Sequence, residues 1–174
     1  MRAPCFHYRP HQGALNIATL LETAADYLQK EDWGFESDLE NSVLRGSVNG
    51  DNVTLNWYLH VIEYEEINSL RVYTPVPLNI PEARRVAVAE LLTRINSRMA
   101  NGNFELDFSD GMVRFGVVLD LMDGALTQAM FMRIFMLSLQ GCDYYSPTIM
   151  SVVYGSLSPD LALEMLDNAA GVMQ

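Results

Sequence analysis

The sequence predicts a two-layer α+β domain in which helices pack on an antiparallel sheet of five strands. Two observations lead to this fold class. Runs of alternating apolar residues flank turn signals at 49–52, 65–66 and 110–111. Segments with helical spacing of apolar residues stand before, between and after these hairpins. The expected order is α-β-β-β-α-β-β-α, in which the last helical region is either one helix or two.

The composition is that of a folded domain with many acidic residues. Of the 174 residues, 49% are hydrophobic and 19% are charged, which is a globular balance. We expect residues 1–13 to form a flexible N-terminal arm and residues 14–174 to form a single domain. The net charge of −11 argues against nucleic acid as a partner, because a phosphate backbone is bound through Lys and Arg side chains.

Cysteine usage and hydropathy favour a cytoplasmic protein. Cys5 and Cys142 lie far apart and form no CxxC pair, so a disulfide framework is not expected. The N-terminus lacks the apolar run of a signal peptide. The most apolar window, 129–139, has 11 residues and contains Arg133, whereas a membrane span needs about 20 apolar residues. We therefore expect no membrane association.

The first helix is expected over about 14–30, and three strands follow it. Gly50-Asp51 predicts a two-residue hairpin loop that places Val48 opposite Val53. Later in the chain, Asp110-Gly111 predicts another two-residue loop that places Phe108 opposite Val113. Both registers gather apolar residues on one face of the sheet, which a slip of one residue would reverse.

The turn at Glu65-Glu66 predicts the second hairpin, with Val61 opposite Leu70 on the apolar face. A loop of four residues would shift the partners but keep the faces. The other face is polar and places His60 opposite Arg71 and Tyr58 opposite Tyr73. This face is the candidate site for a small ligand, and the residues expected to line it are Arg45, His60, Arg71 and Tyr73. His60 is also the best lone acid–base candidate, although a histidine on a polar sheet face is more often structural.

Prolines in 74–81 are expected to end the third strand, because proline interrupts ladder pairing. Pro81 then suits the first turn of a second helix over about 81–100. This helix is locally basic, and its apolar stripe consists of Val88, Leu91, Leu92, Ile95 and Met99.

Four aspartates, Asp107, Asp110, Asp120 and Asp123, fall within 17 residues and raise the question of a metal or acid–base site. In the predicted hairpin Asp107 faces Arg114, as an ordinary cross-strand charge pair. Asp120 falls roughly 20 Å from Asp107 along the strand, which is too far for the two to share one metal ion. The aspartates are therefore expected to mark turns and strand ends.

The last third of the chain is helical, and residues 125–141 are apolar on nearly every side. A helix on a two-layer domain normally buries one stripe, so this one needs cover on a second side. Methionine adapts to irregular surfaces, which favours a partner interface at Met130, Met132, Phe135 and Met136. Cover by the rest of the C-terminal region is the equal alternative. Pro147 either kinks this helix or divides it, and Ser158-Pro159 predicts the start of a last short helix.

The motifs of common enzyme classes are absent from the sequence, which has no GxGxxG, GxxxxGK[ST], HExxH or GxSxG pattern. Cys5, His7 and His11 could in principle bind a metal ion, but without a fourth ligand they form a weak pattern. We therefore expect no catalytic residues, no metal and no cofactor.

Two segments of the sequence carry a family resemblance, "RVYTPVPLNIPEARRVAVAELLTRINSRMANGNFELDFSDGMVRFGVVLDL" and "DYYSPTIMSVVYGSLSPDLAL". Both resemble the YbjN family of bacterial sensory transduction regulators. The resemblance covers about 15–170, and it implies a fold like that of type III secretion chaperones. It also implies protein partners and dimerisation, and it brings no catalytic residues. The basic helix and the N-terminal arm are not matched by it.

The sequence thus predicts a non-enzymatic, cytoplasmic protein that binds another protein or a second copy of itself. Nucleic acid and membranes are not expected as partners. The alternative is a sensor that binds a small molecule on the polar sheet face. A third hypothesis, an enzyme of unfamiliar type, has no motif in its favour.

Overall fold

The structure, a computed structural model, describes residues 17–38, 40–64, 67–121, 124–155 and 157–172. It has the predicted α+β architecture, with one antiparallel sheet and four helices in the described part of the chain. The elements in chain order are α1 (Ile17–Lys30), β1 (Glu36–Asp38), β2 (Val43–Asn49), β3 (Thr54–Tyr64), β4 (Ile67–Asn79), α2 (Glu82–Asn96), β5 (Asn103–Leu106), β6 (Met112–Asp120), α3 (Gln128–Val153) and α4 (Pro159–Val172).

The sheet has six strands in the order β1-β2-β3-β4-β6-β5, and each neighbouring pair is antiparallel. The prediction of five strands was wrong because it missed β1, whose sequence Glu-Ser-Asp has no apolar alternation. Pairing holds this edge strand in place: Glu36 lies opposite Arg45 and accepts a hydrogen bond from its guanidinium at 3.0 Å.

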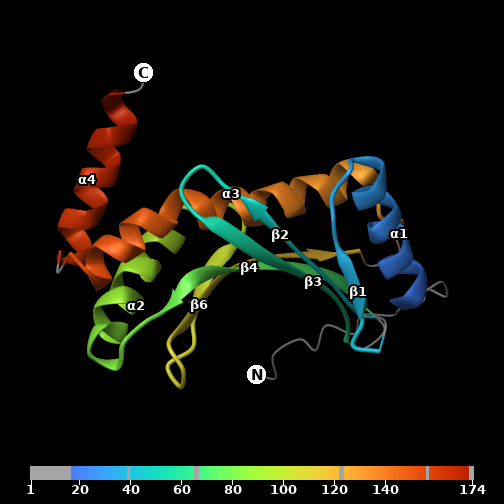
Figure 1. The fold of residues 1–174 in the computed structure, drawn as a ribbon, viewed down its shortest axis with the longest axis horizontal. Helices are drawn as coiled ribbons and strands as arrows, with labels where there is room; N and C mark the ends of the chain where they lie inside the picture. The colour runs from blue at the N-terminus through green and yellow to red at the C-terminus, as the bar shows by residue number, and fades with distance from the viewer. Residues whose placement is uncertain (1–16, 39, 65–66, 122–123, 156, 173–174) are drawn as a thin grey trace, which may run out of the picture.

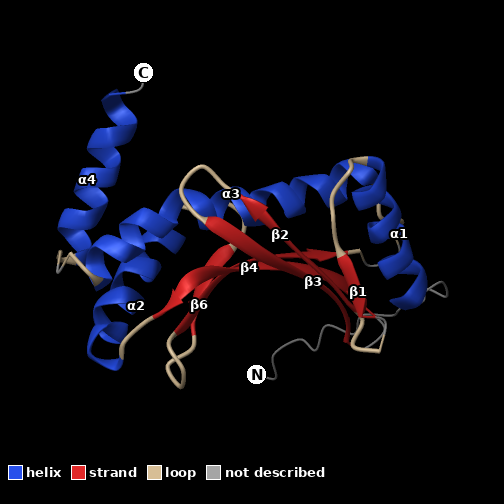
Figure 2. Ribbon diagram, in the orientation of Figure 1, coloured by secondary structure: helices blue, strands red, loops and turns tan. Residues whose placement is uncertain are grey.

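The helices lie on one side of the sheet (Figure 2). α3 crosses the sheet, with α1 near one end of it and α2 and α4 near the other (Figure 1). The core fills the space between α3 and the sheet, and its largest fully buried side chains include Trp57, Phe115, Phe131 and Phe135. The Phe135 ring meets Trp57 edge-on at a centroid distance of 5.0 Å. Burial of large aromatic side chains is a dominant stabilising contribution in such a core.

The first hairpin has the predicted faces but not the predicted register. Val48 pairs with Leu55 rather than with Val53, and Asn49 pairs with Thr54. The loop therefore consists of residues 50–53 instead of two residues. The shift by two positions preserves the side on which each residue lies, because side chains alternate along a strand.

Asp143 on α3 shapes this longer loop. Its carboxylate accepts hydrogen bonds from the backbone N–H groups of Asp51, Asn52 and Val53 at 3.1, 3.0 and 3.0 Å. Consecutive N–H groups that converge in this way form an anion-binding turn. Gly50 is required beside the carboxylate, because a Cβ at this position would overlap the Asp143 oxygen. The Gly50-Asp51 turn signal alone therefore does not determine the length of this loop.

The second hairpin has the predicted register, with Val61 opposite Leu70, and residues 65–66 of its turn lie outside the described residues. β4 does not end at the prolines as predicted. It continues through Pro75 to Asn79, with a register shift between these two residues. A local irregularity of this kind accommodates residues that lack an N–H group.

The third hairpin is also shifted by two residues from the predicted register. Phe104 pairs with Phe115 and Leu106 with Val113, so residues 107–111 connect the strands. Phe108, which was predicted to lie on the apolar face of the sheet, belongs to this connection and is 55% exposed. As in the first hairpin, the connection is longer than predicted. The strand residues lie on the predicted face of the sheet but have different cross-strand partners.

α3 is a single helix of 26 residues with Pro147 inside it, so Pro147 does not divide the region into two helices. Thr127 caps its start, since the side chain accepts a hydrogen bond from the Met130 N–H at 3.2 Å. α4 begins at Pro159 as predicted, and the Ser158 hydroxyl accepts a hydrogen bond from the Leu161 N–H at 3.3 Å. None of the described helices combines the length and apolar character that a membrane span requires.

Candidate functional site

A cluster of aromatic and charged side chains lies on the sheet face away from the helices. Pairing of β3 with β4 places Tyr58 opposite Tyr73 and His60 opposite Arg71, as predicted. The Tyr58 and Tyr73 rings stack with centroids 5.1 Å apart. His60 stacks on Tyr73 at 5.3 Å, and its Nε2 lies 3.2 Å from the Tyr73 hydroxyl oxygen. Three of the four predicted ligand-face residues are thus brought together.

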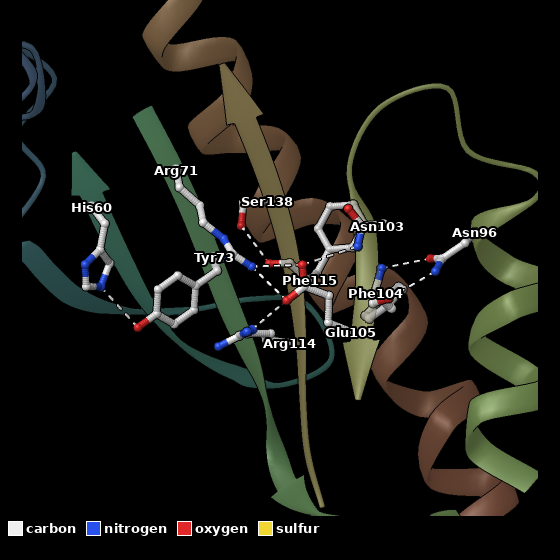
Figure 3. A network of polar contacts seen from close by, with 10 residues as sticks. All are labelled: His60, Arg71, Tyr73, Asn96, Asn103, Phe104, Glu105, Arg114, Phe115 and Ser138. Atoms are coloured by element: carbon white, nitrogen blue, oxygen red, sulfur yellow. Dashed lines mark hydrogen bonds and ion pairs between the residues drawn. The ribbon is translucent and has the colours of Figure 1, made fainter. Parts of the chain in front are cut away.

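Two arginines converge on Glu105 beside these rings (Figure 3). Nη2 of Arg71 donates to both carboxylate oxygens of Glu105 at 2.9 and 2.7 Å, and Nε of Arg114 donates to one of them at 2.8 Å. The guanidinium carbons of Arg71 and Arg114 lie 5.9 and 5.6 Å from the Tyr73 ring centroid. Contacts of this kind add cation–π attraction to the ion pairs.

The Arg71 guanidinium lies beside Gly116. Gly116 lies on β6 opposite Tyr73, and a Cβ at this position would be 3.6 Å from Arg71 Nη2. The Nε of Arg71 is buried and has no hydrogen-bond partner among the described residues. It is an exception, because buried donors are normally paired.

The electrostatics of the cluster favour the neutral form of His60. Burial lowers the pKa of His60 from its ordinary value, and the charges of Arg71 and Arg114 lower it further. For Glu105, burial opposes ionisation, but the hydrogen bond from Arg114 and the two positive charges outweigh burial and lower its pKa. Two guanidinium groups thus face one carboxylate, and the cluster holds an excess of positive charge.

Arg45, the fourth predicted ligand-face residue, lies at the edge of this cluster. It sits opposite Tyr58 and forms an ion pair with Glu36 at 3.0 Å. Both residues line a shallow hollow of about 500 Å³, together with Gly34, Phe35, Gly46, Ser47, Asn56 and Tyr58. Tyr58 belongs to both the hollow and the aromatic stack, so the two features adjoin.

The four residues of the predicted partner interface on α3 differ in their exposure. Met130 is 37% exposed, whereas Met132 and Met136 are partly buried against the core. Phe135 is fully buried between Trp33 and Trp57, so its prediction as an interface residue was wrong. Apolar residues occur on nearly every side of this helix, so their spacing alone does not show which side faces the sheet.

Two hollows flank the outer side of α3. One, of about 410 Å³, lies toward the α2–β5 connection and is lined by Met99, Ala100, Asn101, Arg133, Met136, Leu137 and Gln140. The other, of about 240 Å³, lies toward the first hairpin. Met136 and Gln140 line both hollows, and Tyr144 is 45% exposed one turn further along. We call the surface made by Met130, Arg133, Met136, Leu137, Gln140 and Tyr144 the α3 stripe.

The aspartates of 107–123 lie at turns and strand ends. Asp107 accepts hydrogen bonds from the Ser109 N–H and hydroxyl, and Asp110 accepts one from the Met112 N–H. Asp120 lies at the other end of β6, where it accepts a hydrogen bond from Ser69. The prediction is confirmed for these three residues, and Asp123 lies outside the described residues.

The predicted charge pair of Asp107 with Arg114 was wrong, because the shifted register places Glu105 opposite Arg114. Within the described ranges, no three His, Cys, Asp or Glu side chains gather closely enough to hold a metal ion. Cys5, His7 and His11 lie outside these ranges.

Sequence reasoning missed Glu105, Arg114 and Asp143 as residues that organise these surfaces. Glu105 and Arg114 would have been found with the correct hairpin register. Asp143 had a visible signal, since it is the one acidic residue in the sequence of α3. A lone acid in an apolar helix is costly to bury unless it has partners, which predicts a structural role.

Comparison with known proteins supports the resemblance seen in the sequence. No curated protein matches the chain. A chain of the crystal structure of the ExsC–ExsE complex is similar, with a TM-score of 0.55 and 15% identity over 75% of this chain and 93% of that one. The crystal structure of YbjN from E. coli, described as a "putative transcription regulator", gives a TM-score of 0.47 and 13% identity over 74% of this chain and 94% of that one.

The first of these likenesses shows a shared fold, in agreement with the fold class expected from the sequence. The family comparison covers most of the chain: the model of YbjN, described as "Putative bacterial sensory transduction regulator", matches residues 21–151. The chain therefore belongs to the YbjN family.

Proposed function

We propose that this protein is a non-enzymatic regulatory domain that acts in the cytoplasm by binding a protein partner through the α3 stripe. The observation that carries the proposal is the pair of hollows on either side of Met136 and Gln140. Between and beside them, Met130 and Tyr144 are exposed on the same helix. A raised helix surface between two hollows offers a partner both anchors and pockets.

The chemistry of the α3 stripe suits a protein better than a small polar molecule. Methionine, tyrosine and arginine are enriched in protein interfaces, and this surface contains all three. Methionine side chains adjust to the shape of a partner. The stripe presents a single charged group, Arg133, so a partner would gain its affinity mainly from apolar contact.

The comparisons support a binding role without specifying it. The family is described as sensory transduction regulators, and the similar ExsC–ExsE structure is that of a complex. A second copy of this chain is one candidate partner, in line with the dimerisation that the family resemblance implied. The polar cluster on the sheet favours a role other than catalysis, because its carboxylate and guanidinium groups bind one another.

Replacement of Met130 and Met136 by glutamine tests the α3 stripe. The variant Met130→Gln/Met136→Gln is expected to weaken partner capture and any self-association at least about tenfold, because two apolar anchors are lost. Capture from lysate and light scattering at high micromolar concentration measure the two effects. The matched control is Val118→Gln, which changes a residue of the open sheet face that is 54% exposed.

The outcome is interpretable only if the double variant keeps the melting temperature of the wild type within a few degrees. A folded double variant that captures the same partner and has the same mass in solution would rule out the α3 stripe. A wild-type chain that is monomeric and captures nothing would refute the proposed function itself.

A second candidate function is that of a small-molecule sensor on the sheet face, favoured by the positive charge of Arg71 and Arg114 and by the adjoining hollow. A ligand at about 100 times its Kd stabilises the native state by about 2.7 kcal/mol, which raises the Tm by about 5–10 °C in a chain of this size. A thermal-shift screen of metabolites, with Arg71→Met as the variant that should lose the shift, measures this effect. If no metabolite raises the Tm of the wild type, this candidate fails.

A further inference from the structure

The rest of the protein covers only part of the apolar surface of α4. Ala162 and Leu163 are 2% and 3% exposed, so they form the buried side of the helix. Leu161 and Met165 are 43% and 55% exposed. They are spaced i, i+4 and therefore share one face of the helix, next to the buried side.

α4 is placed so that this face is accessible. It packs against α2 and α3 and projects away from the sheet, with its C-terminal end clear of the other elements in Figure 1. Large exposed apolar side chains on adjacent turns of a projecting helix are typical of a binding surface for another helix.

Charge indicates what could cover this face. The sequence of α4 has the acids Asp160, Glu164 and Asp167 and no basic residue. Arg94 on α2 binds Asp160 at 2.7 Å, and Arg98 binds Asp167 at 2.9 Å. Glu164 has no ion-pair partner within the described residues, and it lies between these two acids along the helix.

Acidic groups outnumber basic ones around the α2–α4 contact even after these ion pairs form. Glu90, Asp160, Glu164 and Asp167 face Arg94 and Arg98, in a chain whose net charge is −11. A second copy would bring an identical acidic helix against the first, which like-charge repulsion disfavours. A partner with lysine or arginine beside its apolar residues would meet the opposite charge.

We infer that the face of α4 formed by Leu161 and Met165 binds an amphipathic helical segment of another protein, whose apolar stripe is flanked by Lys or Arg. The apolar contact supplies affinity and Glu164 selects for positive charge at the flank. This site is separate from the α3 stripe, so either can fail without the other.

A designed peptide tests the inference directly. The probe is a fluorescein-labelled 18-residue peptide of leucine and lysine, with leucines at the i, i+3, i+4, i+7 spacing of an amphipathic helix. Fluorescence anisotropy with the full chain at physiological salt is expected to give saturable binding. Leu161→Ser/Met165→Ser should raise the Kd about tenfold or more, and Glu164→Lys should raise it severalfold.

Two controls separate this site from general attraction to an acidic protein. Val118→Ser removes an apolar side chain of similar exposure, 54%, from the sheet face and should leave the Kd unchanged. A leucine–glutamate peptide of the same pattern should not bind. Circular dichroism establishes that each variant is folded.

Three results would overturn the inference. The folded double variant could bind the lysine peptide as tightly as the wild type, which would indicate attraction to net charge alone. The glutamate peptide could bind equally well, which would exclude charge selection. Sedimentation could show that the wild-type chain dimerises and that Leu161→Ser/Met165→Ser makes it monomeric, which would assign the face to a second copy.

Discussion

Phe135→Ala is expected to destabilise the protein by about 3–5 kcal/mol, the usual cost of removing a fully buried aromatic ring. Phe135 has no exposed surface, and its ring meets Trp33 and Trp57 edge-on at 4.8 and 5.0 Å. It also stacks on Phe131 with centroids 5.8 Å apart. The substitution would leave a cavity at the contact of α3 with the sheet, where the structure can relax only partly.

Urea unfolding monitored by circular dichroism measures this free-energy change. The matched control is Met130→Ala on the same helix, where the side chain is 37% exposed and the expected loss is below about 1 kcal/mol. If Phe135→Ala unfolded at the same urea concentration as the wild type but lost a partner, Phe135 would be an interface residue after all.

Asp143→Ala is expected to cost about 3 kcal/mol, because it leaves several donors of the first hairpin loop without an acceptor. The carboxylate receives three backbone N–H groups and the Asn52 side-chain amide at 3.1 Å. Exposed Asp26→Ala on α1 is the control, with an expected loss below about 0.5 kcal/mol. Equal unfolding midpoints for the two variants would contradict a structural role for Asp143.

The contribution of Asp143 should also depend on pH in a defined direction. Burial favours its neutral form, but the hydrogen bonds from Asn52, Val53 and Asp51 outweigh burial and lower its pKa in the folded state. A lowered folded-state pKa stabilises the protein above the unfolded-state pKa, which is about 3.9. The stability difference between wild type and Asp143→Ala should therefore be full at neutral pH and shrink as the pH falls below about 4.

The sequence predicted correctly on which face of the sheet the strand residues lie, but it did not predict all of their cross-strand partners. Alternation placed Val48 and Val53 on the inner face, and both pack against the core. Their predicted pairing was off by two residues, because loop length depended on contacts that no local pattern contains. In the first hairpin that contact is Asp143, some ninety residues away in sequence.

The residues of the polar cluster were predicted correctly only where the register of their hairpin was predicted correctly. His60, Arg71 and Tyr73 came together because the β3–β4 register was predicted correctly. Glu105, which joins the two arginines, was missed because the β5–β6 register was not. Phe135 was assigned to the wrong side of α3, since an apolar helix does not reveal from its own sequence which of its faces the sheet will cover.

Pro147 has a consequence for the order in which the protein folds. Proline has no N–H, so the carbonyl oxygen of Asp143, four residues earlier, has no helical donor. The Asn52 side-chain amide lies 3.4 Å from this oxygen and replaces the missing donor. The tip of the first hairpin and the middle of α3 thus complete each other's backbone hydrogen bonding. Since such non-local contacts require a large loop to close, we expect the native turn of this hairpin to form late, after α3 has docked on the sheet.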